Sequence, residues 1–218
     1  LKKDKNLTNG EINNKLANQE LRDQVDDHNC TEFRYITKFW RKHFPPLTAW
    51  AEFNQDDNLR CNYTILKFIL RSHDNEKYSK ITNEDIRSIL YKHYSDLLGI
   101  GGQTKQKINS KWSKQGKKDM KQAINKKQIT LEQAIMTEEY LITEMDIAIF
   151  AFFYRIPIVI YYEAKSVKLF KFNNSDNVGH YYFVKNTKDN VLSLNISKDA
   201  IFFKRDTLSD EVNKVMDK

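Results

Sequence analysis

The sequence is short of cysteine, proline and glycine, with two, three and six of them in 218 residues. Two cysteines, Cys30 and Cys61, are too few for a disulfide framework or a four-cysteine zinc site. Free thiols in a reducing compartment are therefore expected, which favours the cytoplasm, either of the source cell or of a host. Scarce proline and glycine exclude collagen-like and proline-rich architectures.

Long hydrophobic runs are also missing. No apolar stretch approaches the roughly 20 residues that span a bilayer, so we expect no membrane anchor, and no secretory signal is visible. The chain opens at Leu1 rather than Met, which suggests a piece of a longer protein.

The residues that are present suffice for a folded domain. Hydrophobic residues make up 40%, aromatic residues 12% and charged residues 30%, and the mean hydropathy is −0.70. A chain of this composition can bury a sizeable core and is unlike a disordered one. We expect a monomer that needs no cofactor and no metal.

Positive charge is concentrated in one segment. The net charge is +7, yet residues 103–128 alone carry nine lysines and one acid, Asp119, and the rest of the chain sums to −1. Trp112 is the only aromatic residue there, whereas single-strand binding surfaces usually interleave several. The favoured interpretation is a solvated Lys-rich insertion. The alternative is a surface for an acidic partner or a phosphate backbone, with nucleic acid a less favoured partner.

Hydrophobic periodicity predicts helices first and strands afterwards. Phe33, Ile36 and Trp40 suggest a helix that stops before Pro45 and Pro46. Later helices are predicted over Cys61–Leu70, from the cap Thr82 to Gly99, over Thr130–Met136 and, capped by Thr143, over Glu144–Tyr154. Predicted strands cover Ile156–Tyr162, Val167–Phe172, His180–Lys185, Val191–Ile196 and Ala200–Lys204. The fold class is α+β, with a mostly antiparallel sheet flanked by helices.

We divide the chain into three parts. Residues 1–46 are expected to form a helical arm that includes a weak amphipathic helix over Glu11–Asp27. Residues 47–205 form the main domain with the Lys-rich insertion 103–128, and residues 206–218 form a C-terminal tail.

One cysteine and one histidine could form a nucleophilic pair. Cys61 falls in the first turn of an apolar helix, where the helix dipole lowers the pKa of a thiol and favours the thiolate. Cys30 follows the carboxylates of Asp26 and Asp27, which disfavour a thiolate. His180 begins a predicted strand and could act as the base for Cys61.

The order of five pieces, over about residues 47–185, resembles the ovarian tumour (OTU) family of cysteine proteases, deubiquitinases with a papain-like site. The pieces are the polar loop and helix of residues 56–66 with Tyr63 as the aromatic, Ile86-Arg87, the lead-in 139–144 with its acid Glu144, the strand Ile156–Tyr161, and His180-Tyr181.

The resemblance implies a papain-like OTU fold and a cysteine-dependent hydrolase acting at the C-terminus of ubiquitin or a ubiquitin-like protein. Cys61 and His180 would be its catalytic residues, and the loop with Asp57 and Asn58 would form the oxyanion hole. The loop of this chain has no Gly, unlike the Asp-Gly-x-x-Cys loop of the family.

The residue that orients His180 is left open. Many OTU proteases have Asp or Asn two residues after the histidine, where this chain has Tyr182. Asn54 or Asp56, and otherwise Asn195, could take that role. The alternative is a catalytically silent ubiquitin-binding version of the domain.

A less favoured alternative is a Mg²⁺-dependent nuclease. Glu163-Ala164-Lys165 follows an apolar strand, and Asp146 could be the partner carboxylate that holds the metal. The same three residues also suit an ordinary hairpin turn.

Overall fold

Seven described strands form the centre of the molecule. The computed structural model describes residues 30–53, 58–162, 169–171, 179–187, 192–197 and 200–217. The strands lie in the order β1 (Cys30–Tyr35), β2 (Ala49–Phe53), β6 (Leu192–Ile196), β5 (His180–Asn186), β3 (Ile158–Tyr162) and β4 (Leu169–Lys171), and β7 (Phe203–Lys204) pairs with β5 outside this order.

The sheet is mixed, with one parallel pair among those described. β3 and β5 run parallel with Val159 opposite Phe183, and the remaining pairs are antiparallel. β5 and β6 are antiparallel, with Asn186 opposite Leu192. The α+β class and the mostly antiparallel sheet predicted from the sequence are thus confirmed.

Side chains alternate between two hydrophobic cores, because successive residues of a strand point to opposite faces. Ile158 and Ile160 of β3 belong to the larger core, whereas Val159 and Tyr161 belong to the smaller one. Covered on both faces, β3 is apolar throughout rather than alternating.

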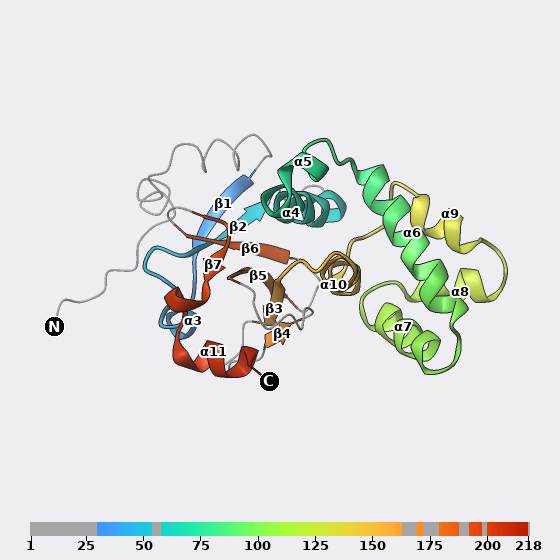
Figure 1. The fold of residues 1–218 in the computed structure, drawn as a ribbon. Coiled ribbons are helices and arrows are strands. Elements are labelled where there is room, and N and C mark those ends of the chain that lie inside the picture. The colour runs from blue at the N-terminus through green and yellow to red at the C-terminus, as the bar shows by residue number, and fades with distance from the viewer. Residues whose placement is uncertain are drawn as a thin grey trace.

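Each face of the sheet is covered by helices (Figure 1). The larger core contains buried residues of α4 (Asn58–His73), α6 (Asn83–Gly99) and α10 (Glu144–Phe153). The smaller core packs under α3 (Lys38–Arg41) and α11 (Asp210–Met216). A short helix, α5 (Asn75–Tyr78), follows α4, and the 3-10 turn Arg205–Thr207 precedes α11.

A helical group lies beside the sheet, beyond α10 (Figure 1). It contains α6, α7 (Gly102–Lys114), α8 (Lys118–Asn125) and α9 (Leu131–Met136). The predicted capping box of Thr82 with Asp85 starts α6, and Thr143, predicted as a cap, precedes α10 and pairs with Asp146 of its first turn.

The expected division of the chain needs three corrections. Residues 30–35 form β1 rather than helix, and Trp40 of α3 is fully buried, so this part of the arm belongs to the sheet and the smaller core. The C-terminal tail contains α11, whose Val212 and Met216 are buried in the same core. The expected helix over 11–27 lies outside the described residues.

The Lys-rich segment is the third correction. It was expected to be a solvated insertion that contributes little to folding, yet it forms α7 and α8 and buries Ile108, Trp112 and Lys117. Apolar residues at 108 and 112 are one helical turn apart, so they form a short stripe that packs on the larger core.

Candidate functional site

Cys61 lies at the amino end of α4, as its fourth residue. The next residue ties this end to the sheet: the side-chain oxygen of Asn62 accepts from the backbone N–H of Leu192 at 3.3 Å. Asn62 Nδ2 donates to the carbonyl of Ile142 at 2.7 Å. The amino end of α4 therefore lies at the end of the sheet where strand β5 finishes and strand β6 starts.

His180 is the first residue of β5 and therefore lies at the opposite end of that strand. Its ring is perpendicular to that of Tyr182 at 5.5 Å between centroids, and the Tyr182 hydroxyl donates to Ser72 Oγ at 3.3 Å, at the carboxyl end of α4. The twelve-residue rise from Cys61 to His73 is about 18 Å. The six residues from His180 to Asn186 span about 20 Å. The backbone of Cys61 and that of His180 thus lie near opposite ends of α4.

The other described histidines lie elsewhere too. His43 Nδ1 is 2.8 Å from Ser209 Oγ beside α11, and His93 stacks on Phe153 at 3.9 Å on the helical side. His73 ends α4, far from Cys61. His28 lies outside the described residues. Within the part of the chain that is described, no imidazole reaches the amino end of α4.

The expected orienting and loop residues are placed only in part. Asn54, Asp56 and Asp57 lie outside the described residues, and Asn58 begins α4. Asn195 is fully buried on β6 and accepts from the Tyr161 hydroxyl at 2.8 Å, on the side of the smaller core. His180 shares the opposite face with Tyr182, so Asn195 does not orient its ring.

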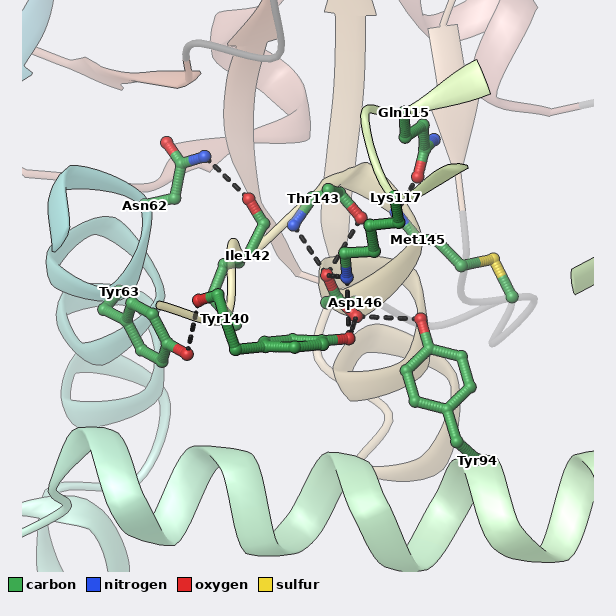
Figure 2. A network of polar contacts seen from close by, with 10 residues as sticks. All are labelled: Asn62, Tyr63, Tyr94, Gln115, Lys117, Tyr140, Ile142, Thr143, Met145 and Asp146. Carbon is green, nitrogen blue, oxygen red and sulfur yellow. Dashed lines mark hydrogen bonds and ion pairs between the residues drawn. The ribbon is translucent and has the colours of Figure 1, made fainter. Parts of the chain in front are cut away.

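A buried carboxylate near the amino end of α4 organises a polar network (Figure 2). Asp146 Oδ1 accepts from the hydroxyls of Tyr94 and Tyr140, both at 2.8 Å. Oδ2 accepts from Lys117 Nζ at 2.6 Å, and from Thr143 through its N–H at 2.6 Å and its hydroxyl at 2.9 Å. Donors from α6, the α7–α8 connection and the start of α10 thus converge on one side chain.

Burial shifts the titration of the groups around Asp146. Lys117 exposes 4% of its surface, and its burial lowers the pKa of the ammonium although the Asp146 carboxylate opposes this shift. Burial, reinforced by the charge of Asp146, raises the pKa of Tyr94 and of Tyr140 well above the usual value. At neutral pH both phenols therefore keep the protons that they donate.

The network continues to α4 through the segment before α10. Lys117 Nζ also donates to the Tyr140 hydroxyl at 2.6 Å, and the Tyr63 hydroxyl donates to the Tyr140 carbonyl at 2.9 Å. Together with the bond from Asn62 to Ile142, these contacts fix segment 140–143 against the first turns of α4 (Figure 2).

A second polar cluster lies at the same end of the sheet, where β5 finishes. Glu144 is buried and accepts from the Tyr162 hydroxyl and, at 3.2 Å, from Asn186 Nδ2, and Lys111 Nζ is 3.8 Å from its other oxygen. Burial and then the Glu144 carboxylate raise the pKa of Tyr162 to about 12. This cluster gives this end of the sheet hydrogen-bonding groups without supplying an imidazole.

The geometry of Asp146 argues against the nuclease alternative. A carboxylate has about four lone-pair positions, and five donors already occupy those of the fully buried Asp146. It has no free position for Mg²⁺. Glu163 and Lys165 lie outside the described residues. The described side chains contain no cluster of three or more His, Cys, Asp or Glu that could hold a metal ion.

Sequence reasoning missed most of this network. The box Thr143-x-x-Asp146 is a readable helix-start signal, and it places Asp146 in the first turn of α10. Nothing in the sequence distinguishes Lys117 from the eight other lysines around it, because its burial depends on how α7 and α8 pack against α10.

Among the described residues, no helix is long and apolar enough to cross a membrane. Comparison with known proteins finds no matching family model, no matching curated protein and no matching solved structure.

Proposed function

We propose that this chain is a non-catalytic domain of OTU-like architecture that binds ubiquitin or a ubiquitin-like protein. The observation that carries the proposal is that the backbone of Cys61 lies in the first turn of α4, whereas His180 packs on Tyr182, whose hydroxyl donates to Ser72 at the carboxyl end of the same helix.

Hydrolysis by a cysteine nucleophile needs a base beside the thiol. A general base acts within hydrogen-bond reach of the proton that it removes, about 2.6–3.2 Å between heavy atoms. The rise of α4 from Cys61 to His73, at whose end His180 lies, is about 18 Å and several times that reach. Neither His43, His73 nor His93 replaces His180 at the amino end of the helix.

The segments that carry the OTU resemblance nevertheless form central elements of the fold. Tyr63 of α4 and Ile86 of α6 are buried in the larger core, and Ile158 and Ile160 of β3 lie in the same core. Glu144, the acid of the lead-in, is buried at the end of the sheet where β5 finishes. A framework in which the backbones of Cys61 and His180 lie near opposite ends of α4 supports a binding role better than a hydrolytic one.

Two measurements with ubiquitin test the proposal. A ubiquitin that carries a C-terminal electrophile should label Cys61 no faster than it labels the thiol of the unfolded chain. Titration of ¹⁵N-labelled ubiquitin with the protein should shift a contiguous set of amide signals, and Cys61→Ala should bind equally well.

Two results would overturn it. Rapid labelling of Cys61 that is lost in His180→Ala would show an active hydrolase whose pair assembles. Absence of any signal change with ubiquitin and with a panel of ubiquitin-like proteins would remove the binding role.

A further inference from the structure

Helices α7 and α8 present a dense positive surface that the proposed function does not use. Seven of the nine lysines of the Lys-rich segment are exposed and Lys121 is half-buried, leaving only Lys117 inside. The exposed ones are Lys105, Lys107, Lys111, Lys114, Lys118, Lys126 and Lys127. Lys107, Lys111 and Lys114 are spaced i, i+4 and i+7, which places them on one face of α7.

This surface is held by the core rather than hanging from it. Trp112 is buried with its ring 4.9 Å from that of Tyr94, and Ile108 is buried beside it. Lys117, at the α7–α8 connection, is fixed by its ion pair with Asp146 (Figure 2). The lysines are thus displayed on anchored helices, which lowers the ordering cost of binding a partner.

Within the part of the chain that the structure describes, the charge of this surface is hardly compensated. The segment contains a single acid, Asp119, and between its exposed lysines and the rest of the described chain the structure shows the contact of Lys111 with Glu144. Like charges at i, i+3 and i, i+4 repel along a helix. An external polyanion would relieve this repulsion.

The chemistry of the surface favours a phosphate backbone over a protein. Protein interfaces centre on buried apolar or aromatic anchors and are depleted in lysine. In the described part of the chain the exposed large hydrophobic side chains are Ile100, Phe152 and Phe153, all outside α7 and α8. Attraction of DNA phosphates needs cations alone.

The surroundings of Trp112 favour a duplex over a single strand. Single-strand surfaces stack bases on exposed aromatic side chains, whereas Trp112 exposes 2% of its surface. The segment contains no arginine, the residue best suited to read guanine edges. We propose that α7 and α8 bind the sugar–phosphate backbone of double-stranded nucleic acid without sequence preference.

Salt-dependent affinity for a duplex tests this proposal. Fluorescence anisotropy of a labelled duplex of about 20 base pairs should show binding. The logarithm of the association constant should fall linearly with the logarithm of the salt concentration between about 50 and 200 mM. The triple variant Lys107→Gln, Lys114→Gln, Lys118→Gln should bind more weakly. Its salt slope should be shallower by roughly 2–3, since each phosphate contact contributes about 0.9.

A charge-matched variant provides the control. Lys38, Lys204 and Lys214 are exposed on α3, β7 and α11, on the other side of the molecule (Figure 1). Replacing these three lysines by Gln lowers the net charge by the same amount. The salt slope of this variant should equal that of the unaltered protein.

Three outcomes contradict the proposal. Equal loss of affinity in both triple variants would show attraction to net charge rather than to this surface. Tighter binding of poly-L-glutamate than of the duplex would assign the surface to an acidic protein. No duplex binding at about 50 mM salt would remove the site altogether.

Discussion

At the scale of single residues, the unusual feature is a lysine and an aspartate that are both removed from water. Lys117 exposes 4% of its surface and Asp146 none, with 2.6 Å between Nζ and Oδ2. Taking two charges out of water is costly, and their attraction offsets this only when the remaining donors and acceptors are satisfied. Tyr94, Tyr140 and Thr143 satisfy them here.

Breaking this pair from the lysine side should strongly destabilise the protein. Lys117→Met leaves the Asp146 carboxylate buried without its cation, and removal of one partner of a buried pair costs about 3–5 kcal/mol. Urea unfolding followed by circular dichroism measures the loss of unfolding free energy.

The neighbouring lysine gives a matched control. Lys118 is exposed, so Lys118→Met should change the unfolding free energy by less than about 0.5 kcal/mol. In the double variant Lys117→Met, Asp146→Leu no charge stays buried, and it should lose less than the sum of its single variants. Simple additivity would show that the two side chains do not stabilise each other.

At the scale of elements, α7 is attached to the protein by one apolar face. Ile108 and Trp112 are buried while the lysines around them are exposed, so a helix of low overall hydrophobicity is held by two side chains. Most helical stability in proteins comes from such packing rather than from propensity.

Truncating the larger of these side chains should detach α7. Trp112→Ala should cost about 3–5 kcal/mol, as for other large-to-small changes in a core. Lys114→Ala, on the exposed face of the same helix, should stay within about 0.5 kcal/mol. Thermal unfolding of both variants compares them, and equal midpoints would mean that the segment is a solvated insertion after all.

The start of α6 allows a milder test. Thr82 Oγ1 accepts from the N–H of Asp85 at 3.1 Å, and the Asp85 carboxylate accepts from the N–H of Thr82 at 2.8 Å. Thr82→Ala removes one half of this box and should cost about 0.5–2 kcal/mol in denaturant unfolding. Ser95→Ala, at an exposed interior position of α6, should not weaken the protein, because Ala is the better helix former.

Predictability from sequence follows the range of the forces involved. Capping signals and apolar strands are local, so α6, α10 and β3 were predictable to within about two residues. Residues 30–35 instead form a strand because β2 pairs with them, a contact between segments that the helical spacing of Phe33, Ile36 and Trp40 cannot reveal. Tertiary pairing here overrides local pattern.

At the scale of the whole molecule, the order of elements along the chain does not show whether the start of a helix lies near the start or the end of a neighbouring strand. The sequence correctly placed Cys61 at a helix start and His180 at a strand start. The sequence does not reveal that the start of α4 and the start of β5 lie at opposite ends of the strands of the sheet. That follows from the antiparallel register of β5 with β6 and from the bond between Asn62 and Leu192.

The histidines also act together at this scale. Burial lowers the pKa of all four described ones, His43, His73, His93 and His180, below the usual value of 6.5. A nearby imidazole, His73, lowers the pKa of His180 further. The folded state therefore binds protons less readily at these sites than the unfolded chain does, and stability should be full above about pH 6.5 and fall as the pH decreases below it.

Denaturant unfolding at several pH values between about 7.5 and 5 should show this loss as a decreasing midpoint. His180→Gln removes one of the four groups, so its midpoint should fall less steeply with acid. The hydrogen bonds from Thr82 lower the pKa of Asp85 below 3.8, so this carboxylate titrates below the window and does not contribute to the loss. A midpoint that is flat across the window, or equally steep in His180→Gln, would show that these imidazoles are as readily protonated in the folded chain as in the unfolded one.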